Sequence, residues 1–136
     1  MRTRFTFVTL GVRHLEQASA FYSSVMGLPP LPSPPNTAFL DLGGITLALY
    51  TRELLAADSG IADNGDAFRS FALSLNLPTA RDVDTLLQSA AAGGGAIIKP
   101  GAPTAWGGYA GYLADPDGFL WEAVWNPKVT VSPAAP

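Results

Sequence analysis

Hydrophobic and polar residues alternate along two stretches of the chain whose starts lie about 65 residues apart. In residues 5–12, Val8, Leu10 and Val12 share one side of the predicted strand, and in residues 69–77 a set of leucines does the same. Alternation with a period of two predicts a β-strand whose apolar side packs on a helix layer. The opposite side of each strand is expected to face a cavity.

A helical spacing of apolar residues follows each of these strands. Apolar residues three and four positions apart predict helices over residues 15–26 and 83–91, which end at Gly27 and at the glycine run 93–95. Three short strand-like runs follow each helix, namely residues 28–31, 36–42 and 45–50 in the first half and residues 96–99, 108–114 and 119–126 in the second. The pattern therefore predicts a βαβββ unit that occurs twice.

The two units set the expected fold class and domain organisation. We expect a single domain over residues 1–127, with repeat one at 5–50, a polar linker with room for a short helix at 51–66, repeat two at 67–126, and a loose tail at 128–136. Neither repeat could bury its apolar strand face alone, so an α+β fold is expected, with a curved mixed sheet around a cleft and the helices outside. Free strand edges favour a homodimer.

Composition narrows the class of partner and the compartment. The 136 residues carry a formal charge of −3, and the eight Lys and Arg residues form no basic stripe, which argues against a nucleic-acid partner. The absence of cysteine excludes disulfides, thiolate metal sites and cysteine nucleophiles, and fits a cytoplasmic location. No apolar run reaches the roughly eighteen residues that a membrane span requires.

Glu122 is the main candidate for chemistry. It alternates with Leu120 and Val124 on the predicted cavity side, where a carboxylate is costly to bury unless it is paired, hydrogen-bonded or protonated. One interpretation makes it a ligand anchor or general base, with Ser70, Tyr50 or a ligand amine as its partner. The other makes it a carboxylate satisfied by a tyrosine hydroxyl and water.

Aromatic residues form a second candidate feature. Trp106, Tyr109 and Tyr112 are interleaved with glycines, which favours a slot for a flat ligand, although ordinary hairpin packing is the alternative. Further rings are expected on the same cavity side, namely Phe5, Phe7, Phe39 and Tyr50. The small hydrogen-bonding residues expected there are Thr9, Thr46, Ser70 and Ser74. The single histidine, His14, is expected at the exposed start of the first helix, so a Ser-His-Asp triad in the cavity is excluded.

Two segments resemble the vicinal oxygen chelate superfamily, which includes glyoxalase I, extradiol dioxygenases and bleomycin resistance proteins. Residues 8–22 are similar to its first strand and helix, and residues 113–122 to its last hairpin. The resemblance implies four metal-ligand positions in the metal-dependent members, which fall here on Phe7, Ala48, Ser70 and Glu122. Of these four residues, only Glu122 has a side chain that binds a divalent metal ion well. We therefore expect a protein of this superfamily that uses no metal ion or other cofactor.

The leading functional hypothesis is a metal-independent small-molecule binding protein that resembles bleomycin resistance proteins. Its ligand is expected to be aromatic or amphipathic, neutral or cationic, and held in a dimeric cleft. The expected ligand-binding residues are Phe7, Thr9, Phe39, Ala48, Tyr50, Ser70, Trp106, Tyr109, Tyr112 and Glu122. The alternatives are an enzyme of the family (a glyoxalase-like lyase, a dioxygenase, or a metal-free isomerase or cyclase with Glu122 as base) and a structural dimer with a vestigial cleft.

Overall fold

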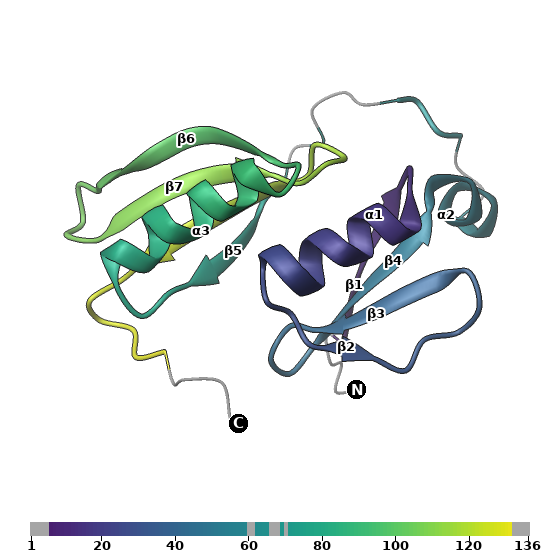
Figure 1. Ribbon diagram of the computed structural model, residues 1–136, viewed down its shortest axis with the longest axis horizontal. Coiled ribbons are helices and arrows are strands. Elements are labelled where there is room, and N and C mark those ends of the chain that lie inside the picture. Colours follow the sequence, from purple (N-terminus) through teal and green to yellow (C-terminus); the bar gives the residue numbers. More distant parts are fainter. Residues whose placement is uncertain (1–5, 60–61, 66–68, 70, 132–136) are drawn as a thin grey trace, which may run out of the picture. The chain divides into compact units, whose positions relative to one another are not determined.

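The structure is a computed structural model that describes residues 6–59, 62–65, 69 and 71–131. The chain divides into two compact units, Met1–Ala67 and Phe68–Pro136 (Figure 1). Each unit contains one βαβββ module with its own four-stranded mixed sheet, so the repeat predicted from the sequence is confirmed. No helix in the described part of the chain is long and apolar enough to cross a membrane.

The first unit has its strands in the order β1-β4-β3-β2, with β1 parallel to β4 and the other pairs antiparallel. Its elements are β1 (Phe7–Val12), α1 (Leu15–Ala20), the π-helical turn η1 (Phe21–Val25), β2 (Pro30–Leu31), β3 (Thr37–Asp41), β4 (Thr46–Thr51) and α2 (Arg52–Ser59). The short helix allowed for in the linker is α2. Prolines around β2 lack N–H donors, which explains why this strand is only two residues long.

The core of the first unit lies between α1 and one face of its sheet. Leu10, Leu40, Leu47 and Leu49 are all fully buried on that face, as the alternation in the sequence predicts. The helix predicted over residues 15–26 is α-helical only as far as Ala20, because the Met26 N–H donates to the Phe21 carbonyl at 3.1 Å and forms a wider π turn. The helix then ends at Gly27, whose φ of 71° is the left-handed conformation expected there.

The second unit repeats this arrangement with its strands in the order β5-β8-β7-β6. Its elements are β5 (Leu73–Asn76), α3 (Ala80–Ala92), β6 (Ala96–Pro103), β7 (Tyr109–Ala114) and β8 (Leu120–Trp125), and α3 lies across one face of the sheet (Figure 1). β5 begins four residues later than the sequence indicates. Arg69 lies outside the ladder, where its guanidinium stacks on Phe119 at 4.0 Å and donates to the Asp117 carbonyl at 3.1 Å.

The core of the second unit lies between α3 and its sheet. Val83 and Leu87 on α3, and Leu113 and Trp121 on the strands, are all buried. Gly111 allows the close approach of the helix, because a Cβ there would lie 2.7 Å from the Cδ1 atom of Leu87 and 2.7 Å from a backbone oxygen. In both units one sheet face is thus covered by a helix, and we call the opposite face the open face.

Candidate functional site

Three polar side chains form a row across the open face of the second unit. Ser74 on β5 and Tyr112 on β7 are both register partners of Glu122 on the central strand β8, so the three side chains point to the same side. The Ser74 hydroxyl donates to Oε1 of Glu122 at 3.0 Å, and the Tyr112 hydroxyl donates to Oε2 at 3.2 Å. Sheet register therefore gives each carboxylate oxygen one hydroxyl partner. We call this set the Glu122 row.

The Glu122 row carries a negative charge that its two hydroxyl partners do not neutralise. The charge of Glu122 raises the pKa of Tyr112 above its ordinary value, and burial and the hydrogen bond raise it further. Tyr112 is therefore a neutral hydrogen-bond donor at pH 7. Within the described residues, Glu122 accepts hydrogen bonds from Ser74 and Tyr112 and takes part in no ion pair.

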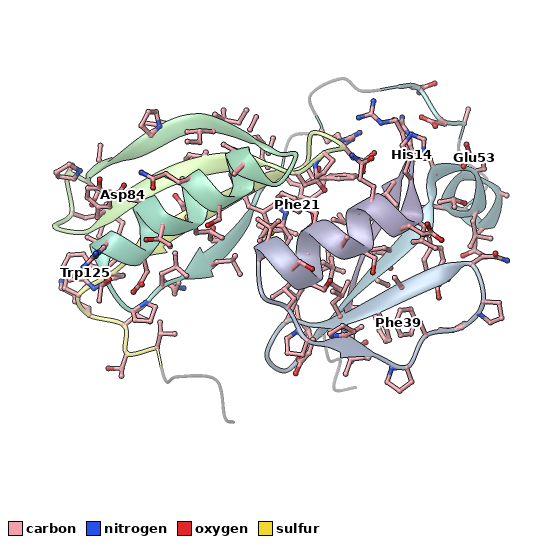
Figure 2. All side chains as sticks on the ribbon, in the orientation of Figure 1. His14, Phe21, Phe39, Glu53, Asp84 and Trp125 are labelled. Atoms are coloured by element: carbon pink, nitrogen blue, oxygen red, sulfur yellow. The ribbon has the colours of Figure 1, made fainter. Side chains whose placement is uncertain are left out.

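The corresponding row in the first unit has no charged side chain. Ala48 is the third residue of β4, as Glu122 is the third residue of β8, and the register partners of Ala48 are Thr9 and Phe39. Phe7 packs edge-to-face on Phe39, with ring centroids 5.4 Å apart, and Phe7 remains 46% exposed. We call Phe7 and Phe39, the latter labelled on β3 in Figure 2, the aromatic pair.

Helix α2 covers one end of the open face of the first unit. At Gly11 an added Cβ would lie 3.2 Å from the Cδ2 atom of Leu55 and 3.4 Å from Cα of Arg52, so glycine permits this close packing. Arg52 donates through Nε to Asp63 at 2.8 Å, pairs with the same carboxylate through Nη2, and donates to the Gly65 carbonyl at 2.7 Å. Tyr50, the register partner of Gly11, lies half-buried at this end.

The structure places two of the predicted aromatic residues away from the Glu122 row. Tyr109 points to the helix side of its sheet, where its hydroxyl donates to both carboxylate oxygens of Asp84 on α3 at 2.9 and 3.1 Å. Trp106 lies in the turn between β6 and β7, 51% exposed, with its ring filling the space where Gly108 has no side chain. Trp106 precedes Tyr112 by six residues. Because Tyr112 is the register partner of Glu122, Trp106 lies several residues along the hairpin from the Glu122 row.

Three further predictions concern Ser70, Tyr50 and His14. Ser70 lies outside the described residues. Within the second unit the partners of Glu122 are Ser74 and Tyr112, and Tyr50 lies on β4 of the first unit. His14 is exposed at the start of α1 and its side chain caps no backbone group, as expected for a residue without a site role (Figure 2).

Ser74 is expected on the cavity side from the sequence, but not as the partner of Glu122, and the Asp84 contact is not expected at all. The pairing of this segment with the last strand was the signal that could have selected Ser74 as the partner of Glu122. Asp84 lies one residue after the buried Val83 on α3, and no feature of the sequence connects it with Tyr109.

Of the three implied metal-ligand positions that the structure describes, only that of Glu122 carries a donor atom suited to a metal. Phe7 and Ala48 have no donor atom, and both oxygens of Glu122 accept hydrogen bonds from hydroxyl groups. The described residues contain no group of three or more His, Cys, Asp or Glu side chains that could hold a metal ion. Zinc enzymes use about three protein ligands, whereas the described positions supply one carboxylate, that of Glu122.

The two βαβββ modules, each with a four-stranded mixed sheet, are the architecture of the glyoxalase fold. Residues 4–123 then match the model of the Glyoxalase/Bleomycin resistance protein/Dioxygenase superfamily. The protein therefore belongs to this superfamily, the vicinal oxygen chelate group that the sequence motifs indicate. The match spans both units and ends at Ala123, one residue beyond Glu122.

Solved structures agree with this assignment. A glyoxalase-related enzyme from Fulvimarina pelagi is 31% identical, with a TM-score of 0.87 over 96% of this chain and 94% of that chain. A glyoxalase/bleomycin resistance protein/dioxygenase family enzyme from Burkholderia phytofirmans PsJN is 25% identical, with a TM-score of 0.75 over 88% and 96%. A hypothetical protein from S. aureus, 23% identical with a TM-score of 0.82 over 93% and 95%, shares the fold. Comparison with curated proteins gives no match.

Proposed function

We propose that this protein binds a small organic molecule without using a metal ion. The Glu122 row offers a binding position for a polar group. The aromatic pair, which belongs to the other unit, offers one for an aromatic or other apolar group. The observation that supports this most directly is the state of Glu122, a half-buried carboxylate whose described partners are two neutral hydroxyls. A carboxylate has room for about four hydrogen bonds, so two acceptor positions remain for a ligand.

The chemistry of the two open faces supports an aromatic or amphipathic ligand. The rings of Phe7 and Phe39 offer faces and edges for stacking, and Thr9 supplies a hydroxyl in the same row. Tyr50 adds a ring with a polar tip. Binding of this kind sequesters the ligand, which is the activity suggested by the resemblance to bleomycin resistance proteins.

Thermal unfolding in the presence of small aromatic compounds tests this proposal. A ligand that binds the folded state raises Tm by mass action, and a metal-independent site gives the same increase with and without excess chelator. Elemental analysis of the purified protein is expected to show much less than one metal ion per chain. An increase in Tm that chelator abolishes, together with stoichiometric metal, would contradict the proposal.

Variants locate the site in the same assay. Glu122→Gln and Phe39→Ala should each reduce the ligand-induced increase in Tm, because they remove the anchor charge and one ring of the aromatic pair. Glu53→Gln is the matched control, since it makes the same chemical change on the exposed surface of α2 (Figure 2). Equal responses in all four proteins would remove Glu122 and Phe39 from the site.

A second candidate function is metal-free isomerisation, which the name of the F. pelagi relative, a glyoxalase-related enzyme, favours. Glu122 would take the C–H proton from the hydroxyl-bearing carbon of an α-hydroxy carbonyl compound, and the C–H electron pair would form an enediolate. It would return the proton to the former carbonyl carbon, while the hydroxyl proton passes to the oxygen on that carbon and the hydroxyl-bearing carbon becomes the new carbonyl. Proton NMR in D2O tests the first step, proton abstraction, with phenylacetone as the probe. Loss of the signals beside the carbonyl in the wild type, but not in Glu122→Gln, would favour the enzyme.

A further inference from the structure

Glu122 has a negative charge that the described residues leave uncompensated. Ser74 and Tyr112 donate one hydrogen bond to each carboxylate oxygen, and both donors are neutral. The row is flanked on β8 by Leu120 and Val124, and Val124 is buried, so part of the surroundings of the carboxylate is apolar. A charge in such surroundings interacts more strongly with an opposite charge than it would in water.

Lys99 and Arg69, two of the basic side chains described on this unit, form no ion pair with Glu122. Lys99 is the register partner of Tyr112 on the edge strand β6, two strands from Glu122, which is about 10 Å between backbones. It is exposed and forms no ion pair with Glu122. Arg69 stacks on Phe119 and donates to the Asp117 carbonyl in the turn that precedes β8.

We propose that the Glu122 row selects ligands that carry a cationic nitrogen with at least two N–H groups, such as a primary ammonium or an amidinium. This inference rests on the proposed function and specifies its ligand class. Two N–H groups match the two acceptor positions that Ser74 and Tyr112 leave open on the carboxylate. Hydrogen bonds between ionised partners are about twice as strong as those between neutral ones, so the cation is preferred to a neutral donor of the same shape.

Tyr112 gives this site a reporter that distinguishes a cation from a neutral ligand. The charge of Glu122 is the first cause of the raised pKa of Tyr112. A cation bound to the carboxylate offsets that charge and lowers the pKa of the tyrosine. A neutral ligand that only covers the row removes water and raises the same pKa further.

Calorimetric titration with matched probes tests the inference. Benzylammonium and benzamidinium are compared with benzyl alcohol, which has the same ring and a neutral donor. In the wild type the cations should bind about tenfold or more tightly than the alcohol, and added salt should reduce the difference. The preference should fall to about twofold or less in Glu122→Gln, whose thermal unfolding is measured to confirm that it folds.

Two further variants sharpen the result. Glu53→Gln should keep the wild-type preference, because Glu53 is an exposed residue of α2 that does not belong to the Glu122 row. Lys99→Gln should increase the affinity for cations by about twofold to fivefold and leave the affinity for benzyl alcohol unchanged, since it removes a nearby positive charge. Carbon-13 NMR of labelled tyrosine, with Tyr112→Phe to assign the signal, should show the pKa of Tyr112 falling when benzylammonium is bound.

The outcomes separate this inference from the proposed function. Equal affinity for benzylammonium and benzyl alcohol, or a preference that survives Glu122→Gln, would overturn the cation inference while leaving small-molecule binding in place. Failure of the cationic probes to bind, while other aromatic compounds still raise Tm, would also overturn it. Failure of every aromatic compound to bind or to raise Tm would overturn the proposed function as well.

Discussion

At the scale of single residues, the contact between Glu122 and Tyr112 gives a direct electrostatic prediction. Because the charge of Glu122 is the first cause of the raised pKa of Tyr112, Glu122→Gln should lower this pKa toward its ordinary value of 10.0. The pKa is measured by carbon-13 NMR of labelled tyrosine. Glu53→Gln should leave it unchanged, and an unchanged value in Glu122→Gln would show that the carboxylate is not close to the hydroxyl.

Tyr109 and Asp84 predict how stability depends on alkaline pH. The hydrogen bond to Asp84, followed by burial and the Asp84 charge, raises the pKa of Tyr109 above 10.0. Because the folded-state pKa is the higher one, the stabilisation from this tyrosine is complete below pH 10 and is lost as the pH rises through the folded-state pKa. Asp84→Asn removes the negative charge and one of the two carboxylate oxygens that accept from Tyr109, so it should make the free energy of unfolding fall less steeply above pH 10.

Urea unfolding at several pH values below and above pH 10 measures how the free energy of unfolding depends on pH. Tyr109→Phe should flatten the profile in the same way, because it removes the titrating group itself. Parallel wild-type and variant curves above pH 10 would mean that the Tyr109 hydroxyl does not depend on Asp84 in the folded protein.

At the scale of elements, the N-terminus of α3 depends on one hydroxyl group. Thr79 Oγ1 accepts a hydrogen bond from the Asp82 N–H at 3.1 Å and donates to the Asp82 carboxylate at 2.7 Å. Thr79→Ala should therefore lower the free energy of unfolding by about 1 kcal/mol, whereas Thr79→Ser should keep most of it. Urea unfolding measures both variants, and equal losses would mean that the methyl group of Thr79, not its hydroxyl, stabilises the helix.

The faces of strands could be predicted from the sequence, because side chains alternate with a fixed period. Trp121 and Glu122 were placed on opposite faces correctly for this reason. The same alternation places Tyr109 and Tyr112 on opposite faces of the sheet, because residues three positions apart on a strand point to opposite sides. Tyr109 therefore faces Asp84 on α3 while Tyr112 faces Glu122.

Register could not be predicted in the same way. A shift of β5 by four residues along β8 leaves every side chain on its original face, so alternation does not distinguish Ser70 from Ser74 as a neighbour of Glu122. The register that the structure has places Ser74 opposite Glu122. The π turn at Phe21–Val25 could not be predicted either. One additional residue in a helical turn hardly changes the spacing of apolar residues over a helix of this length.

At the scale of the whole molecule, the strand edges lead to a prediction about assembly. Each four-stranded sheet ends in two edge strands, and β6 is an edge strand of eight residues on which Ile97 and Ile98 are 40% and 56% exposed. Proteins commonly cover such edges or protect them with Lys and Pro. In β6, Lys99, Pro100 and Pro103 protect the middle and the end of the strand, and the isoleucines near its start have no such protection. We therefore expect a homodimer, the commonest symmetric assembly.

Light scattering coupled to size-exclusion chromatography should give a mass of about 28 kDa, twice that of the 14.2 kDa chain, across a wide range of protein concentrations. The mass should persist at high salt, because screening weakens contacts between charges but not the burial of apolar surface. A mass of 14.2 kDa at every concentration would contradict the dimer. It would also mean that any ligand bound to the Glu122 row or the aromatic pair is held by a single chain, with the exposed isoleucines of β6 left in water.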